Sequence, residues 1–229
     1  MTRSIAVIAA HPDDEVLGFG GTMRRHADAG DRVAVLILAS GLAARGEDAA
    51  NATAMAALRE HARAANTLLG VARLDFADFP DNRMDSLPLL DVVKRVEAFL
   101  EEERPSAVYT HHAGDLNVDH RIAAQAVMTA CRPLPASPVA TILAGEVNSA
   151  TEWAGPLALP FVPTEFVDIE LTLAAKLKAL ACYAGELRDW PHPRSLRGLE
   201  ALARRRGSQS GFTAAEAFVT MRRRHSNRP

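Results

Sequence analysis

Residues 4–15 read Ser-Ile-Ala-Val-Ile-Ala-Ala-His-Pro-Asp-Asp-Glu, an apolar run that ends abruptly in polar side chains. The apolar part, residues 4–10, is continuous and rich in β-branched residues, which is typical of a parallel strand buried on both faces. The polar part begins at His11 with no glycine-rich turn. Nucleotide-binding enzymes of the Rossmann type place glycines there, and carboxylates would repel a pyrophosphate, so the segment disfavours that class.

The alternation of strand and helix continues along the first half of the chain. Further buried strands are predicted at residues 32–39, 73–79 and 106–111, and helices at residues 16–29, 53–69, 87–103 and 121–131. Strands that alternate with helices predict a parallel sheet covered by helices on both faces. We therefore expect an α/β fold, a three-layer sandwich with a mostly parallel sheet.

The second half of the chain is less regular. Strands are predicted at residues 139–147 and 165–171, and helices at residues 172–184, 196–206 and 213–223. The proline-rich residues 133–138 suggest a connector. We expect one domain over residues 1–229, with a core in residues 1–132 and a small C-terminal elaboration in residues 133–229.

Composition excludes several classes of protein. A formal net charge of −2 argues against a general nucleic-acid binder. The two cysteines, Cys131 and Cys182, form no CxxC pair, which favours a reducing compartment. No apolar run approaches the length of a membrane span, and the N-terminal run is too short for a signal peptide. We therefore expect a cytoplasmic protein without a membrane span.

Polar side chains follow three of the predicted strands directly. His11 follows the first strand, Asp81 follows the third, and residues 111–120 follow the fourth. Ligands of such sheets bind at the carboxyl ends of the strands. We therefore expect these three clusters to converge on one functional site.

The residue types in these clusters suit a metal ion. His11 and Asp14 lie three residues apart around a strand-to-helix turn, and His120 is the best candidate for a third ligand. A catalytic zinc site uses three protein ligands of this kind and leaves one position for water. Magnesium and calcium prefer oxygen ligands, so two histidines and one aspartate favour zinc.

Asp13 is left over beside this ligand set. A carboxylate that does not bind the metal but reaches its water is the expected general base. A simpler interpretation is that Asp13, Asp14 or Asp119 only caps a helix. Two such motifs at converging strand ends favour the site over the caps.

The segment Ala10-His11-Pro12-Asp13-Asp14-Glu15, continued by Val16-Leu17-Gly18 and Gly20-Gly21, resembles the first motif of the PIG-L/LmbE-like zinc-dependent N-deacetylase family. Asp119-His120 resembles the second motif, and residues 79–85 and 110–123 also match. The resemblance implies a Rossmann-like fold, zinc held by His11, Asp14 and His120, and Asp13 as a base that also protonates the leaving amine. The implied reaction removes an N-acetyl group from a small amino sugar or sugar conjugate.

One position departs from the family pattern. Many members carry a histidine three residues before the metal-binding one, thought to help stabilise the oxyanion, and this chain has Asn117 there. Asn117 donates a hydrogen bond but carries no positive charge. His192 is a second candidate for the oxyanion donor, and His111 and His112 are candidates for partners of the metal ligands. Asp119 is placed to orient one of those two imidazoles.

Further polar residues are candidates for binding substrate. They are Arg45, Arg59, Asp81 and Arg83. Turn chemistry alone explains Asp81, whereas Arg83 is suited to a sugar hydroxyl or a phosphate. Trp153 is suited to stacking on a sugar ring or to an interface, and with the C-terminal helices it marks a possible homo-oligomer contact.

Two other functions remain open at this point. A non-catalytic sugar-binding protein on the same scaffold would not need the intact ligand set and Asp13. A hydrolase acting on a different N-acyl substrate would use the same residues. Zinc-dependent release of acetate distinguishes both from an N-deacetylase.

Overall fold

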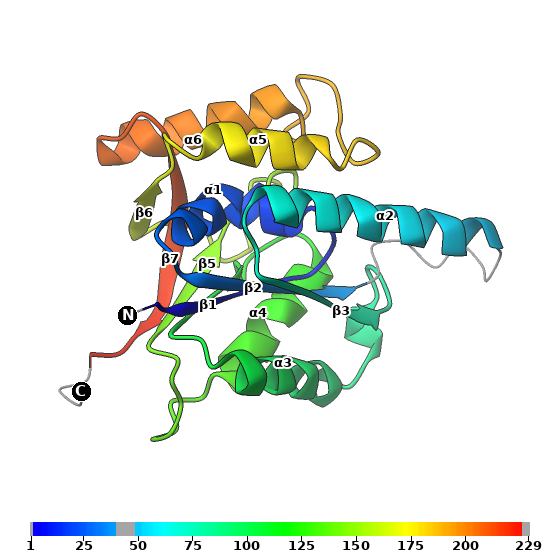
Figure 1. Cartoon of the computed structure of the whole chain (residues 1–229), viewed down its shortest axis with the longest axis vertical. Coiled ribbons are helices and arrows are strands. Elements are labelled where there is room, and N and C mark those ends of the chain that lie inside the picture. Colours follow the sequence, from blue (N-terminus) through cyan, green and yellow to red (C-terminus); the bar gives the residue numbers. More distant parts are fainter. Residues whose placement is uncertain (1, 40–48, 226–229) are drawn as a thin grey trace.

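The structure, a computed structural model, describes residues 2–39 and 49–225. These residues form a seven-stranded sheet with the strand order β3-β2-β1-β4-β5-β7-β6 (Figure 1). The strands are β1 (Ser4–Ala9), β2 (Arg32–Ala39), β3 (Arg73–Phe79), β4 (Ala107–His111), β5 (Thr141–Gly145), β6 (Glu165–Asp168) and β7 (Ala215–Arg223). The first five in that order pair in parallel, and β7 runs antiparallel to both of its neighbours. The expected α/β fold with a mostly parallel sheet is confirmed.

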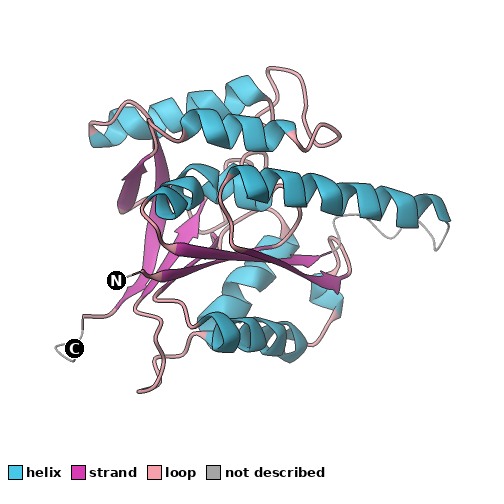
Figure 2. Cartoon of the chain, in the orientation of Figure 1, coloured by secondary structure: helices cyan, strands magenta, loops and turns pink. Residues whose placement is uncertain are grey.

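Helices cover both faces of the sheet (Figure 2). On one side lie α1 (Asp14–Asp28) and α2 (Ala49–Leu68), with α5 (Leu173–Ala181) and α6 (Leu196–Ser210) stacked beyond them. On the other side lie α3 (Leu89–Glu103), α4 (Val118–Ala130) and the short 3-10 helix η1 (Met84–Ser86). Among the described residues, no helix has the length and apolarity needed to cross a membrane.

The central strand β1 shows why its sequence is apolar throughout. Ile5 and Val7 belong to the core under α1 and α2, whereas Ala6 and Ile8 belong to the core under α3 and α4. Successive side chains of a strand point to opposite faces, so a strand covered on both sides has no polar position. Burial of each Ile or Val side chain contributes about 1.5–3 kcal/mol.

The helix predicted at residues 213–223 is wrong, because this segment forms β7. It pairs with both β5 and β6, so that Phe218 lies opposite Gly145 on one side and Glu165 on the other. Both edges of β7 are therefore paired, and its first four residues, Ala215 to Phe218, are buried. A short buried apolar run has no periodicity that distinguishes a strand from a helix.

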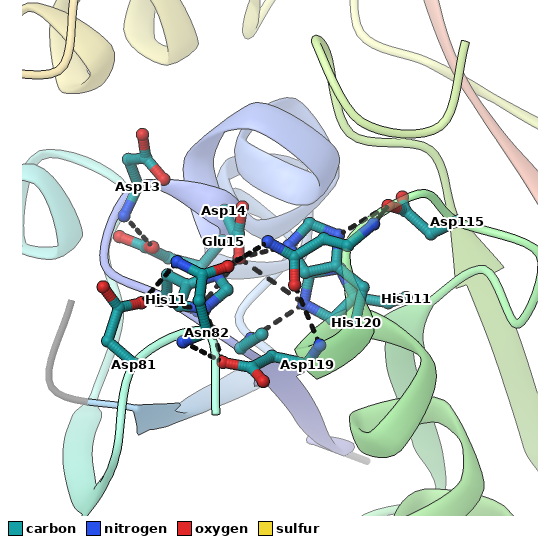
Figure 3. Close-up of polar contacts among 12 residues, drawn as sticks. His11, Asp13, Asp14, Glu15, Asp81, Asn82, His111, Asp115, Asp119 and His120 are labelled. Carbon is teal, nitrogen blue, oxygen red and sulfur yellow. Dashed lines mark hydrogen bonds and ion pairs between the residues drawn. The ribbon is translucent and has the colours of Figure 1, made fainter. Parts of the chain in front are cut away.

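The order of the strands determines where a site is expected. The chain passes from β1 to β2 on one side of β1 and later returns to β4 on the other side. The loops after β1 and β4 therefore leave the sheet in different directions, and in open α/β sheets ligands bind at the carboxyl ends of strands related in this way. The polar segments that follow β1, β3 and β4 all lie at this edge (Figure 3).

Candidate metal centre and catalytic site

The loop from β1 to α1 has an unusual backbone. Asp13 is the residue before α1 and has a φ of 99° and a ψ of −30°, a left-handed conformation. Such a conformation costs a residue other than glycine about 1–3 kcal/mol. The side chain of Asp13 does not cap the helix. The backbone N–H groups of His11 and Asp13 instead donate to Asp14 Oδ2 at 2.9 Å and to Glu15 Oε2 at 3.0 Å.

Three buried side chains bring their ligand atoms together at the end of β1. His11 Nδ1 and His120 Nε2 each lie 3.1 Å from Asp14 Oδ2. His11 comes from the end of β1, Asp14 from the first turn of α1, and His120 from the first turn of α4 (Figure 3). The structure therefore brings together the three ligands that were predicted, and they are able to hold a metal ion.

The donor atoms fit a small cation. Asp14 Oδ1 is buried without a hydrogen-bond partner, and His120 Nε2 faces Asp14 without the alignment of a hydrogen bond. Ligand atoms of a tetrahedral zinc ion lie about 3.3 Å from one another, given bonds of about 2.0–2.1 Å. The observed separations of 3.1 Å are close to this value.

Electrostatics at the ligand set favour positive charge. Burial lowers the pKa of His11, but hydrogen bonds to Asp119 and Asp14 outweigh it and raise the pKa to about 10. Burial likewise lowers the pKa of His120, but Asp14 and Asp115 raise it to about 9. Burial raises the pKa of Asp14, yet the adjacent histidines hold it well below its usual range.

Each histidine of the set has a carboxylate close to its second ring nitrogen, the one that does not face Asp14. His11 Nε2 lies 3.0 Å from Asp119 Oδ2, and His120 Nδ1 lies 3.2 Å from Asp115 Oδ1. Such contacts fix the orientation of a metal-binding imidazole. Asp119 was expected to orient His111 or His112, and this is corrected to His11. Asp115 was not predicted, although its place in the loop before α4 was a signal.

Asp119 is further fixed by backbone groups of the turn after β3. It accepts hydrogen bonds from the N–H groups of Asn82 at 2.7 Å and Met84 at 3.0 Å. Asp81 Oδ1 also lies 3.2 Å from His11 Nε2. Asp81, predicted to bind substrate, thus lies beside His11 of the candidate ligand set.

The two neighbouring histidines of β4 lie in different surroundings. The His111 ring stacks on His120 with a centroid distance of 3.9 Å, and its Nε2 accepts the N–H of Ala10 at 2.7 Å. Burial, helped by His120, lowers the pKa of His111 to about 3. His112 instead contacts the carbonyl of Leu159 at 2.9 Å. His111, rather than His112, is therefore the imidazole beside the ligand set.

Asp13 is buried and paired with an arginine from the far end of the chain. Arg194 Nη1 lies 3.1 Å from Asp13 Oδ2, and Arg194 Nε donates to Ser149 Oγ at 2.8 Å. Burial raises the pKa of Asp13 well above its usual range, and Arg194 opposes this rise. Arg194 was missed, although it lies two residues from His192 in the sequence.

The proposed oxyanion donors have other partners in this structure. Asn117 caps α4 by accepting the N–H of Asp119 at 2.8 Å, and its Nδ2 donates to Asn82 Oδ1 at 2.8 Å. His192 Nδ1 accepts the N–H of Arg194 at 3.1 Å, and its ring packs edge-on against Trp153. Among the described residues, no hydrogen bond or ion pair joins His192 to Asp13 or to the ligand set.

The arginines predicted to bind substrate lie in different places. Arg59 pairs with Asp78 and covers the ring of Phe76 at 5.0 Å. The side chain of Arg83 is exposed at the start of η1. Arg45 lies outside the described residues.

A comparison with protein families places the chain among known proteins. Residues 6–131, more than half of the chain, match the family model PIG-L, described as GlcNAc-PI de-N-acetylase. A curated protein of Escherichia coli K12, the uncharacterized deacetylase YaiS, is 30% identical over 182 residues, which cover 77% of this chain and 91% of that protein.

Other similar proteins differ in the reactions that they are named for. The 4-oxalmesaconate hydratase of Pseudomonas putida is 30% identical over 238 residues, covering 95% of this chain and 86% of that protein. The solved structure of N,N'-diacetylchitobiose deacetylase from Pyrococcus horikoshii has a TM-score of 0.77 and 22% identity, covering 96% of this chain and 84% of that one. The fold is shared across these reactions.

Proposed function

The chain belongs to the PIG-L family of de-N-acetylases, and from this premise we propose that it is a zinc-dependent hydrolase that removes an N-acetyl group from an amino sugar or sugar conjugate. Hydrolytic N-deacetylation is the enzyme class that follows from the family. The zinc ion, the role of Asp13 and the sugar are the finer parts of the proposal. Zinc, when bound, lowers the pKa of its water to about 7 and polarises a carbonyl.

One observation carries the proposal: a three-ligand set lies next to a carboxylate that is not part of it. His11 and His120 each place a ring nitrogen 3.1 Å from Asp14 Oδ2, whereas the Asp13 carboxylate points to Arg194. Metal ligation and proton transfer then fall to different side chains. A base must stay free to accept a proton, so this separation is what a hydrolase needs.

The reaction adds water to the acetamide and breaks its C–N bond. Asp13 accepts one proton from the attacking water as the new C–O bond forms. Asp13 then gives that proton to the nitrogen as the C–N bond breaks, which yields acetate and a free amine. Arg194 holds the Asp13 carboxylate in place between these steps.

The oxyanion of the tetrahedral intermediate needs a hydrogen-bond donor. We assign this role first to Asn117, because its Nδ2 lies at the same edge as the ligands and its partner Asn82 is an exposed side chain. His192 is the second candidate. Arg59, Asp81, Arg83 and Arg45 remain the candidates for contacts to the sugar.

A pair of neighbouring aspartates tests the division of labour. Asp13→Ala is expected to keep bound zinc and to lower kcat by about 10²–10⁴-fold, the usual contribution of a general base. Asp14→Ala is expected to lose zinc as well as activity. Zinc content per chain and acetate release are measured on both variants. An Asp13→Ala variant with bound zinc and near wild-type turnover would refute the role of Asp13.

A second function has one specific observation in its favour. The hydratase relative matches 95% of this chain, more than the 77% matched by YaiS. A hydratase adds water to a carbon–carbon double bond and releases no acetate. Assaying the same preparation for loss of absorbance of an unsaturated tricarboxylate and for acetate release distinguishes the two reactions.

A further inference from the structure

Glu15 is a fully buried carboxylate that the mechanism above does not use. It lies in the first turn of α1 and accepts hydrogen bonds from three directions. Oε1 accepts the hydroxyl of Tyr183 at 2.5 Å and Nδ2 of Asn66 at 2.9 Å. Oε2 accepts the backbone N–H of Asp13 at 3.0 Å. The three donors come from α2, from the turn after α5, and from the loop that carries Asp13.

The last of these contacts is made to a residue whose backbone is strained. Asp13 has a φ of 99°, a backbone angle that residues other than glycine rarely adopt. A strained conformation persists only where the surrounding structure holds it. Glu15 supplies such a hold, since its own position is fixed by Tyr183 and Asn66.

We propose that Glu15 is a positioning residue that keeps the Asp13 backbone in its left-handed conformation and thereby aims the Asp13 carboxylate at Arg194 and the reacting water. The proposal rests on the role of Asp13 in the proposed function. Glu15 itself touches neither substrate nor metal ligand atoms in this assignment.

The chemistry of the pocket explains why a carboxylate is needed there. A carboxylate is an acceptor at both oxygens, and all three neighbours donate to it here; the amide NH2 of Asn66 and the backbone N–H of Asp13 can only donate. In Glu15→Gln the amide NH2 faces at least one of these donors. Asn66 is not free to turn, because its Nδ2 also donates to the carbonyl of Ala62 at 2.9 Å. The substitution therefore weakens the hold on Asp13 without changing the size of the side chain.

A double-mutant cycle in kcat tests this role. Glu15→Gln is expected to lower kcat about 10²-fold with KM and zinc content little changed, because a misplaced catalytic group costs about this much. In an Asp13→Ala background, Glu15→Gln is expected to change the residual kcat less than about 3-fold. The reason is that Glu15 acts on catalysis only through the Asp13 carboxylate, which this background lacks. An equal loss in both backgrounds, or no loss in the wild-type background, overturns the proposal.

Two further variants separate positioning from folding. Glu216→Gln makes the same change in another buried carboxylate, which accepts the backbone N–H groups of Gly21 and Thr22 in α1 at 2.8 Å. It is expected to lower Tm and to leave kcat unchanged. Tyr183→Phe removes one donor to Glu15 and adds no polar mismatch, so it decides the question if Glu15→Gln does not fold. A lower kcat with normal zinc content supports the proposal, and an unchanged kcat overturns it.

A crystal structure of the Glu15→Gln or Tyr183→Phe variant tests whether Glu15 fixes the Asp13 backbone, and it needs no activity assay. Departure of Asp13 from positive φ, with loss of its contact to Arg194, is the expected result. Retention of both features contradicts the proposal. This readout stays decisive if the wild-type protein releases no acetate from any substrate, which would refute the proposed function instead.

Discussion

At the scale of single residues, two adjacent aspartates have opposite surroundings. Asp14 lies among imidazoles that hold its pKa well below the usual range. Asp13 is buried beside Asp14 and Glu15, and its pKa lies well above the usual range despite Arg194. Environments that push two carboxyl groups apart in pKa suit them to different tasks. Asp14 is therefore suited to bind a cation, and Asp13 to exchange a proton.

Arg194 offers a test of the Asp13 environment through pH. The guanidinium lowers the pKa of Asp13, so its removal in Arg194→Met raises that pKa further. The base must be deprotonated to act, so the acidic limb of the kcat/KM profile is expected to move to higher pH. Arg194→Lys keeps a positive charge beside Asp13, so its acidic limb is expected to lie between those of wild type and Arg194→Met. Profiles that superimpose for wild type and Arg194→Met would show that Arg194 does not act on the base.

Asn117 has two roles that a pair of substitutions separates. Asn117→Ala removes the cap of α4 and is expected to cost about 1 kcal/mol of stability, together with the loss of the oxyanion donor. Asn117→Ser keeps a good cap and removes the amide donor. We expect kcat to fall about 10²-fold in both variants and stability to fall only in the first. His192→Ala, assayed in parallel, should then retain kcat, and the reverse result assigns the oxyanion contact to His192.

Part of the site was predictable from local sequence and part was not. His11, Asp13, Asp14 and His120 follow strands that the alternating pattern predicts to be parallel, so their convergence at one edge was predicted, and the structure adds that the two strands are neighbours. The contact between Arg194 and Asp13 joins residues far apart in the sequence and depends on how α5 and α6 pack. The Glu15 contacts to Asn66 and Tyr183 depend on tertiary packing in the same way.

At the scale of elements, a buried ion pair joins α1, α5 and β7. Lys176 Nζ donates to Glu216 Oε1 at 2.5 Å and to the carbonyl of Leu17 at 2.8 Å. Glu216 in turn accepts the N–H groups of Gly21 and Thr22. A Cβ atom at Gly21 would lie 2.8 Å from Ile169, so only glycine permits this close approach. The helix that carries Asp14 is therefore anchored to β7, the strand that lies between β5 and β6.

Removal of one partner of this pair should be costly. Lys176→Met is expected to lower the free energy of unfolding by about 3–5 kcal/mol, because it leaves the Glu216 charge buried without its cation. The double variant Lys176→Met with Glu216→Leu should lose less than the sum of the two single variants. Urea unfolding followed by circular dichroism measures all three. Additive losses would mean that the two side chains do not interact energetically.

The element that sequence patterns failed to predict is β7. Its first four residues are buried, its last five are partly buried or exposed, and its pairing with β5 and β6 makes it a strand. These partners lie about 50–80 residues earlier in the chain, and that long-range pairing is invisible to a local pattern.

At the scale of the whole molecule, the two halves of the chain share one sheet. Residues after position 132 supply β5, β6 and β7 to it, together with α5 and α6. The same half supplies Arg194 and Ser149 next to Asp13. This sharing supports the proposal that residues 1–229 form a single domain, with the candidate ligand set in the first half and the arginine partner of Asp13 in the second.

The central claim is that the protein releases acetate from an N-acetylated amino sugar by means of a zinc ion. The most direct measurement incubates the purified protein with a panel of N-acetylated amino sugars and their conjugates, and quantifies acetate and free amine. The account predicts equal amounts of both products from at least one member of the panel, loss of release after chelation, and recovery on addition of zinc. No release from any member, or release that persists without metal, would contradict it.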